Sequence, residues 1–92
     1  MNGTETVAWL KQNVTDNNSI DQAVSVLEEN GFLCQNVTGS SSWDHPRITR
    51  TVICSKRIEA TSVGFKTVSA VMGLDSANSL IEVGYNVNSV NL

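Results

Sequence analysis

Charged residues and histidine are both scarce in this chain of 92 residues. Lys, Arg, Asp and Glu together make up 16% of it, compared with about 25% in an average globular domain. The single histidine, His45, excludes a metal site built from several imidazoles. The glycines are scattered and form no phosphate-binding loop. We therefore expect a protein that is not an enzyme, with no catalytic residue, no metal ligand and no cofactor.

The pair Asp44-His45 follows a short run of serines and invites comparison with a Ser-His-Asp catalytic triad. A triad is defined by the geometry of its three side chains, and neighbouring residues of a loop rarely point at one another. We therefore interpret His45 as an exposed loop residue. A pocket that gathered His45 with two carboxylates would reopen the enzyme hypothesis.

Long hydrophobic runs are absent as well. No stretch approaches the roughly 18 apolar residues of a transmembrane helix, and residues 1–4 lack the charged start and the apolar stretch of a signal peptide. The formal net charge of −3 argues against binding to nucleic acid. We expect no transmembrane segment and no nucleic-acid partner.

Cysteine is limited to Cys34 and Cys54, each within a stretch that has the composition of a β-strand. An even number of cysteines in a short chain predicts a disulfide bond, and disulfides persist in oxidising compartments. Closing a loop of about 20 residues would stabilise the fold by roughly 3 kcal/mol. The alternative is a pair of reduced, buried thiols. The disulfide hypothesis implies a periplasmic or secreted protein whose signal peptide has been removed.

The first of two predicted helices covers residues 4–14. Val7, Leu10 and Val14 recur on one face of this segment, as expected for a helix that packs on a core. Thr4 is the candidate N-cap.

A second helix is predicted between Ser19 and Gly31, and its two ends have the clearer signals. Ser19 with Gln22 forms a capping box. Gly31 supplies the left-handed residue that ends a helix, and Phe32 then falls where it can contact Leu27.

After the second helix the apolar pattern changes from helical to alternating. Four strands are predicted, at residues 32–38, 48–58, 63–72 and 80–90. Short connections favour an antiparallel meander with one face packed on the helices. We predict a single α+β domain over residues 1–92, with the element order ααββββ.

Charge is distributed unevenly along the chain. Residues 1–31 contain five carboxylates and one lysine, a net charge of −4, whereas residues 47–66 contain five basic residues and one glutamate, a net charge of +4. This predicts an acidic side formed by the helices and a basic patch on the second and third strands. The candidate anion-binding residues are Arg50, Lys56, Arg57 and Lys66. The alternative interpretation is ordinary solvated surface charge.

The two tryptophans are candidate anchors for a protein partner, because aromatic residues dominate interface energetics. On a helical wheel Trp9 lies about 200° from Val7, opposite the apolar stripe. Alternatively, the first helix is covered on two sides or Trp9 lies against the second helix, and Trp43 belongs to a small core of its own loop. The candidate partner-binding residues are Trp9, Trp43, Asp44, His45, Arg47 and Arg50.

The last predicted strand carries no charged residue after Glu82. Charges on an edge strand discourage pairing with another chain. A homodimer formed through this edge is therefore a further hypothesis.

Together these features favour a small exported interaction module without enzymatic activity, of which an inhibitor or an immunity-type protein is a concrete example. Two alternatives remain open. The chain could bind a small anionic ligand through the basic second and third strands, or it could be the accessory domain of a larger exported assembly.

Overall fold

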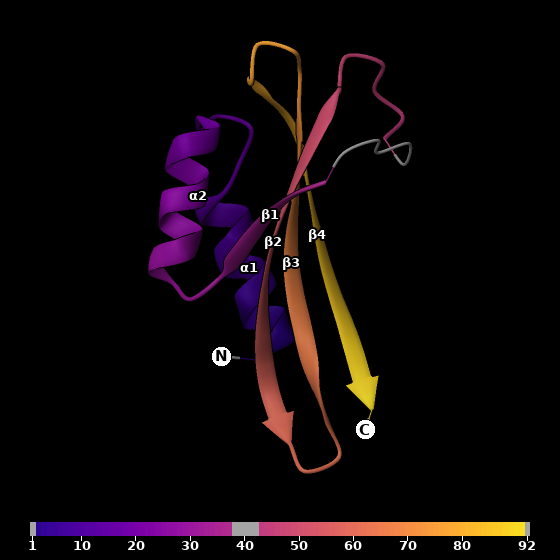
Figure 1. Ribbon diagram of the computed structural model, residues 1–92. Coiled ribbons are helices and arrows are strands. Elements are labelled where there is room, and N and C mark those ends of the chain that lie inside the picture. The colour runs from indigo at the N-terminus through magenta and orange to yellow at the C-terminus, as the bar shows by residue number, and fades with distance from the viewer. Residues whose placement is uncertain (1, 38–42, 92) are drawn as a thin grey trace.

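The computed structural model describes residues 2–37 and 43–91 (Figure 1). Two helices come first and four strands follow, which confirms the predicted order ααββββ. The elements are α1 (Gly3–Asn13), α2 (Ile20–Glu29), β1 (Leu33–Val37), β2 (Arg50–Thr61), β3 (Gly64–Leu74) and β4 (Leu80–Asn91). Thr38, the predicted end of the first strand, and residues 39–42 lie outside the described residues.

Helix α1 begins earlier than predicted. Its N-cap is Asn2, whose side-chain Oδ1 accepts a hydrogen bond from the Glu5 backbone N–H at 2.8 Å. Thr4 is therefore not the cap but an exposed residue of the first turn. The predicted apolar face is correct, because Leu10 is fully buried within the helix and Val14 is fully buried directly after it.

Both predicted ends of α2 are confirmed. Ser19 and Gln22 exchange the two hydrogen bonds of a capping box. Gly31 has a φ of 88°, a left-handed conformation that glycine adopts without steric cost. The next backbone N–H, that of Phe32, donates to the carbonyl of Leu27 at 3.0 Å, and both side chains enter the core.

The four strands form one antiparallel sheet in the order β1-β2-β3-β4, as predicted for a meander. Strand β2 begins at Arg50 rather than residue 48, because Ile48 still belongs to the preceding turn and donates its N–H to the His45 carbonyl. At its other end β2 continues beyond the predicted limit. Pairing with β3 resumes at Thr61 after an irregularity at which Glu59 has a φ of 48°.

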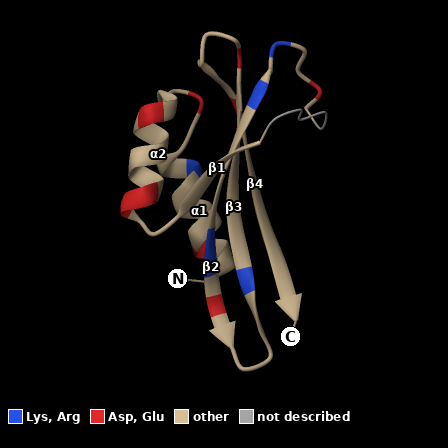
Figure 2. Ribbon diagram, in the orientation of Figure 1, with Lys and Arg blue, Asp and Glu red and all other residues tan. Residues whose placement is uncertain are grey.

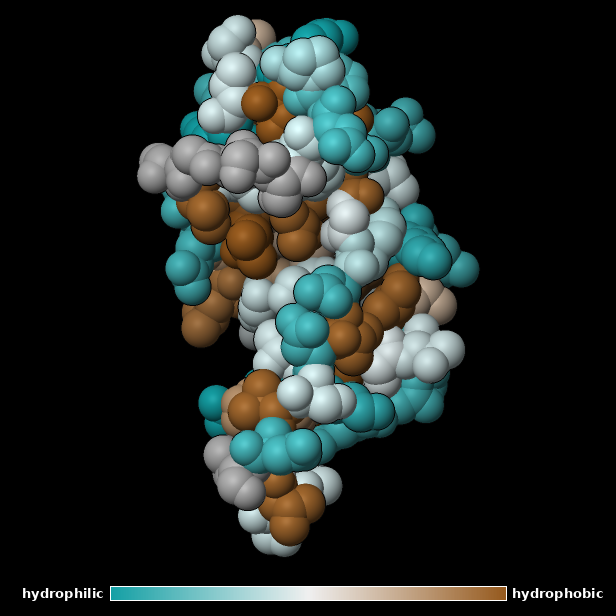
Figure 3. All heavy atoms as spheres, turned by 90° about the vertical axis from the view of Figure 1, so that its right-hand side faces the viewer, coloured by the Kyte–Doolittle hydropathy of each residue, from teal (hydrophilic) through white to brown (hydrophobic). Residues whose placement is uncertain are grey.

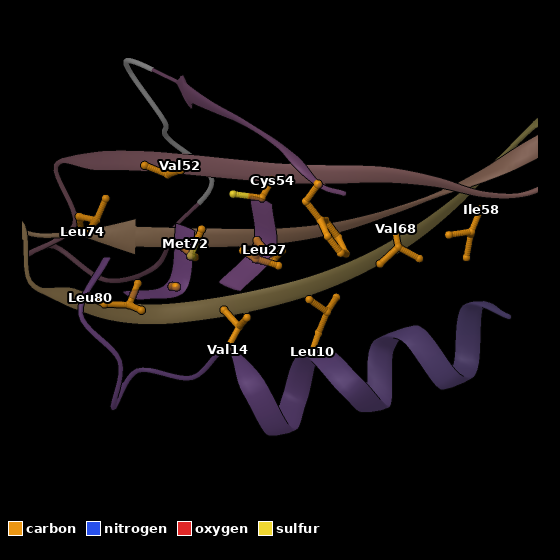
Figure 4. Packing of buried hydrophobic residues seen from close by; sticks show 13 residues of the cluster. Leu10, Val14, Leu27, Val52, Cys54, Ile58, Val68, Met72, Leu74 and Leu80 are labelled. Atoms are coloured by element: carbon orange, nitrogen blue, oxygen red, sulfur yellow. The ribbon is translucent and has the colours of Figure 1, made fainter. Parts of the chain in front are cut away.

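Both helices lie on the same side of the sheet (Figure 1). Figure 4 shows Leu10 and Val14 pointing from α1 toward the strands. On β2 and β3 the even-numbered residues of the central segments face the helices, as the alternation of a strand requires. The core residues contributed by these two strands are Val52, Cys54, Ile58, Val68, Ala70, Met72 and Leu74.

The predicted disulfide is present. Cys34 on β1 and Cys54 on β2 lie directly opposite each other and are joined by an S–S bond of 2.02 Å. Cys54 is fully buried in the core. The bond therefore fixes the short edge strand β1 to the sheet at a position that also packs against the helices.

In the part of the chain that the structure describes, no helix has the length and apolar character needed to cross a membrane.

Replacing both cysteines, as Cys34→Ala with Cys54→Ala, is expected to lower the free energy of unfolding by about 3 kcal/mol, mainly because the unfolded chain regains the entropy of a closed loop. Urea denaturation followed by circular dichroism measures the change. A reductant should lower the urea midpoint of the native protein and leave that of the double variant unchanged. A native protein unaffected by full reduction would contradict the stabilising role of the bond.

Candidate protein-binding face of the sheet

In the described part of the chain, both helices pack on one side of the sheet and none on the other (Figure 1), and we call this other side the open face. Strand register places its residues in rows that cross the four strands. One row contains Gln35, Ile53, Val71 and Gly84. The next row contains Leu33, Ser55, Ser69 and Asn86.

Residues 43–48 fold back over one end of the open face. The Trp43 indole Nε1–H donates a hydrogen bond to the Thr51 hydroxyl at 2.8 Å, and Thr51 is only 2% exposed. Ile48 lies against Gly73, where a Cβ atom would come within 2.6 Å of the Ile48 side chain. Trp43 is half-buried. The loop thus forms a small second core on the open face, which is the alternative considered for Trp43.

The rest of the open face carries small polar and apolar side chains. Leu33 is 77% exposed, and Ile53 and Val71 are half-buried. The hydroxyl groups of Ser55 and Ser69 are hydrogen-bonded to each other at 2.8 Å. Figure 3, which views the molecule from the side away from the helices, shows apolar atoms in patches separated by polar ones.

Charged side chains are few on this face. Among the described strand residues that point to it, they are Arg57 and Glu82, which lie toward opposite ends of the sheet. Arg57 covers the Phe65 ring, with its guanidinium carbon 3.8 Å from the ring centroid. The open face is therefore a weakly charged surface with scattered apolar groups.

Four of the six predicted partner-binding residues lie together in the 43–48 loop beside the open face. Asp44 is exposed, and His45 accepts a hydrogen bond at Nδ1 from the Arg47 backbone N–H at 3.2 Å. The Arg47 side chain is 67% exposed and contacts the Asp75 carboxylate at 3.4 Å. With the half-buried Trp43, these residues form a polar rim at the end of the open face.

The carboxylate of Asp75 holds the neighbouring β3–β4 turn together. The pKa of this carboxyl group lies below its ordinary value of 3.8, and the largest cause is the hydrogen bond that it accepts from the Ser79 backbone N–H. The Ala77 backbone N–H and the Arg47 guanidinium stabilise the negative charge as well. The Arg47 contact thus joins the 43–48 loop to this turn.

Trp9 does not project from an exposed polar face, and its placement is the alternative considered for it, a helix covered on two sides. Its ring stacks on the Phe32 ring with centroids 6.3 Å apart and an interplanar angle of 13°. Trp9 is half-buried and packs against the core on the helix side. Helix α1 is covered on two sides, by the sheet and by the aromatic residue that follows α2. Arg50 also lies on the helix side, in a groove beside α2.

The four candidate anion-binding residues do not converge. Lys56 and Arg57 are neighbours and therefore point to opposite faces of the sheet. Lys56 donates to the Asn30 carbonyl at 2.8 Å, and Lys66 contacts the Glu59 carboxylate at 3.0 Å. Arg50 lies at the far end of β2, with a buried Nε that has no hydrogen-bond partner. Figure 2 shows basic segments spread along β2 and β3, and acidic ones on α2.

His45 does meet two carboxylates, those of Asp16 and Glu82, around an open groove of about 440 Å³ beside β4. None of the hydrogen bonds among the described residues joins its imidazole to either carboxylate. Within residues 2–37 and 43–91, no three His, Cys, Asp or Glu side chains lie close enough to hold a metal ion. The groove gathers titratable groups but contains no hydrogen-bonded acid–base pair.

Tyr85 closes one side of this groove. Its hydroxyl donates a hydrogen bond to the Val14 carbonyl at 2.6 Å, which ties β4 to the end of α1. Burial raises the pKa of Tyr85 above its ordinary value of 10.0, and the nearby Asp16 carboxylate adds to the rise.

Sequence reasoning missed Leu33, Ile53 and Val71 as surface residues. The signal available was their alternation with core residues, since each precedes or follows a position that faces the helices.

No family model, curated protein or solved structure matches this chain.

Because the folded state raises the pKa of Tyr85, it stabilises the neutral phenol. Stability should be unaffected by this group below about pH 10 and should fall as the pH rises toward the folded-state pKa. Tyr85 is the single tyrosine, so ultraviolet absorbance of tyrosinate measures its titration directly. The Tyr85→Phe variant should lack this alkaline loss. Titration of the folded protein at or below pH 10 would contradict the assignment.

Proposed function

We propose that this protein is an exported module that binds another protein through the open face of its sheet. The observation that carries the proposal is a sheet that, among the described elements, has both helices on one side and none on the other. Leu33, Ile53 and Val71 remain in contact with water there, beside the half-buried Trp43. A partner surface would remove these groups from water, and apolar area buried in this way favours association.

The disulfide supports the exported part of the proposal. A bond between Cys34 and Cys54 persists where thiols are not kept reduced, which favours the periplasm or the cell exterior. An inhibitor or an immunity-type protein is the concrete form in which a small domain of this kind would act. Such proteins bind by surface complementarity and need no chemistry of their own.

The open face suits a protein partner better than a small anion. An anion site requires several cations to point at one place, and Lys56 and Arg57 point to opposite sides of the sheet. Lys66 is already paired with Glu59. The rim residues Asp44 and Arg47 carry opposite charges, as is common around a protein interface.

A charge introduced on the open face is expected to weaken partner binding without unfolding the protein. Leu33→Asp alters a side chain that is 77% exposed, so the fold should tolerate it. The matched control is Val63→Asp, where the valine is 68% exposed at the β2–β3 turn, at the opposite end of the sheet from the 43–48 loop. Burying the new carboxylate in an interface should weaken binding about tenfold or more.

A photo-cross-linking residue in place of Leu33, in the exported fraction of the native cell, should identify the partner, and one in place of Glu28 on the helix side should not. Affinity for that purified partner is then measured by calorimetry for the native protein and both aspartate variants. The proposal requires loss with Leu33→Asp alone. Equal affinities for all three proteins, or cross-links only from position 28, would overturn it.

A further inference from the structure

Strand β4 forms one edge of the sheet, and within residues 2–37 and 43–91 no other helix or strand lies along its outer side (Figure 1). It is twelve residues long, whereas the opposite edge strand β1 has five. A long edge strand presents a row of backbone N–H and C=O groups that can pair with another strand.

The register shows which backbone groups point to the free edge. The Cα atoms of Cys34 and Cys54 are 3.9 Å apart, the close spacing of a pair that is not hydrogen-bonded to each other. Along antiparallel strands, hydrogen-bonded and non-hydrogen-bonded pairs alternate, so the backbone of Cys54 is hydrogen-bonded to its other neighbour, Ala70 of β3. Ala70 therefore makes no backbone hydrogen bond to Tyr85, which lies opposite it on β4. The backbone N–H and C=O of Tyr85 consequently point away from β3.

The Leu74 carbonyl confirms this alternation, because it accepts from the Thr49 N–H on the β2 side. The same parity assigns the free-edge groups to Val83, Tyr85, Val87 and Ser89. Among the described residues, no turn, loop or cap hydrogen bond uses the backbone of these four residues.

The features that usually protect an edge are missing from β4. Its single charged residue is Glu82, near its start, and no lysine, arginine or proline follows Lys66 in the sequence. The irregularity in register lies between Gly73 and Leu74, opposite the beginning of β4, and leaves residues 82–91 regular. After Glu82, the described part of β4 therefore has no charged residue, proline or register irregularity of the kind that protects an edge strand.

We propose that β4 pairs with β4 of a second copy of this chain, antiparallel and around a two-fold axis perpendicular to the sheet. The strand is complementary to itself. In a register centred near Asn86, the free-edge residues meet one another, with Val83, Tyr85 and Val87 all on the helix side. On the open face, the amides of Asn86 and Asn88 meet uncharged residues of the other copy.

Charge also favours a second copy. When β4 is paired about Asn86, Glu82 lies opposite Val90, so like charges never face each other across the strands. The groove beside the first half of β4, lined by Asp16, His45 and Glu82, then lies next to the uncharged second half of the partner strand. The groove provides room for the end of that strand.

This dimer is independent of the proposed partner-binding function. A two-fold axis perpendicular to the sheet places both open faces on the same side and covers neither of them. The dimer also gives an assay that needs only the purified chain.

Sedimentation velocity over about a hundredfold range of concentration should show a reversible shift from one chain to two. Hydrogen exchange in the dimer should slow at Val83, Tyr85, Val87 and Ser89. The double variant Asn86→Lys with Asn88→Lys should weaken dimerisation about tenfold or more, since lysines then face each other. Both asparagines are exposed, so the fold should remain. Gln35→Lys, an exposed position on edge strand β1, is the matched control and should dimerise normally.

Charge reversal makes the test decisive. Mixing the double lysine variant with a double glutamate variant at the same two positions should restore a dimer that contains one copy of each. A native protein that stays monomeric throughout, with β4 amides exchanging freely, would overturn the proposal and leave the edge for a strand of another protein. A dimer unaffected by the lysines would overturn it as well.

Discussion

Among the described elements, both helices cover the same side of the sheet, and this arrangement determines which side of each strand is buried. The apolar residues between the helices and the sheet form a continuous core, which includes Leu10 of α1, Leu27 of α2, and Met72 and Leu74 of β3. Among the described residues, the 43–48 loop covers one end of the other side, and the rest of that side alternates small polar groups with a few apolar ones. A sheet that faces water on one side is a stable solution in antiparallel structures, because a single packed face suffices for the core.

The local elements could be predicted from the sequence because their signals are local. The capping box at Ser19, the glycine that ends α2 and the alternation of β4 each depend on residues a few positions apart. The disulfide followed from there being only two cysteines, and the structure places them directly opposite each other. The α1 cap was wrong because Asn2 and Thr4 are both good N-caps, and only the path of the chain decides between them.

The site was harder to predict, because it depends on which elements meet. A helical wheel of α1 cannot show that Phe32, after α2, covers Trp9. The positive charge of residues 47–66 suggested one basic patch, but strand alternation divides Lys56 from Arg57, and Glu59 neutralises Lys66. Leu33 and Ile53 are ordinary strand residues in the sequence, and they become a surface feature only because no helix lies over them.

The disulfide also limits how far the sheet can grow. Within the described residues, β1 pairs with β2 at five positions and is joined to it by the bond from Cys34 to Cys54. If β1 detached under reducing conditions, β2 would become a second edge twelve residues long, with Val52, Ile53 and Ile58 along it. A sheet with two long edges can add copies on both sides and extend into a filament, whereas one with a single available edge closes as a pair. For a chain that dimerises through β4 as proposed, the disulfide would therefore keep the assembly finite.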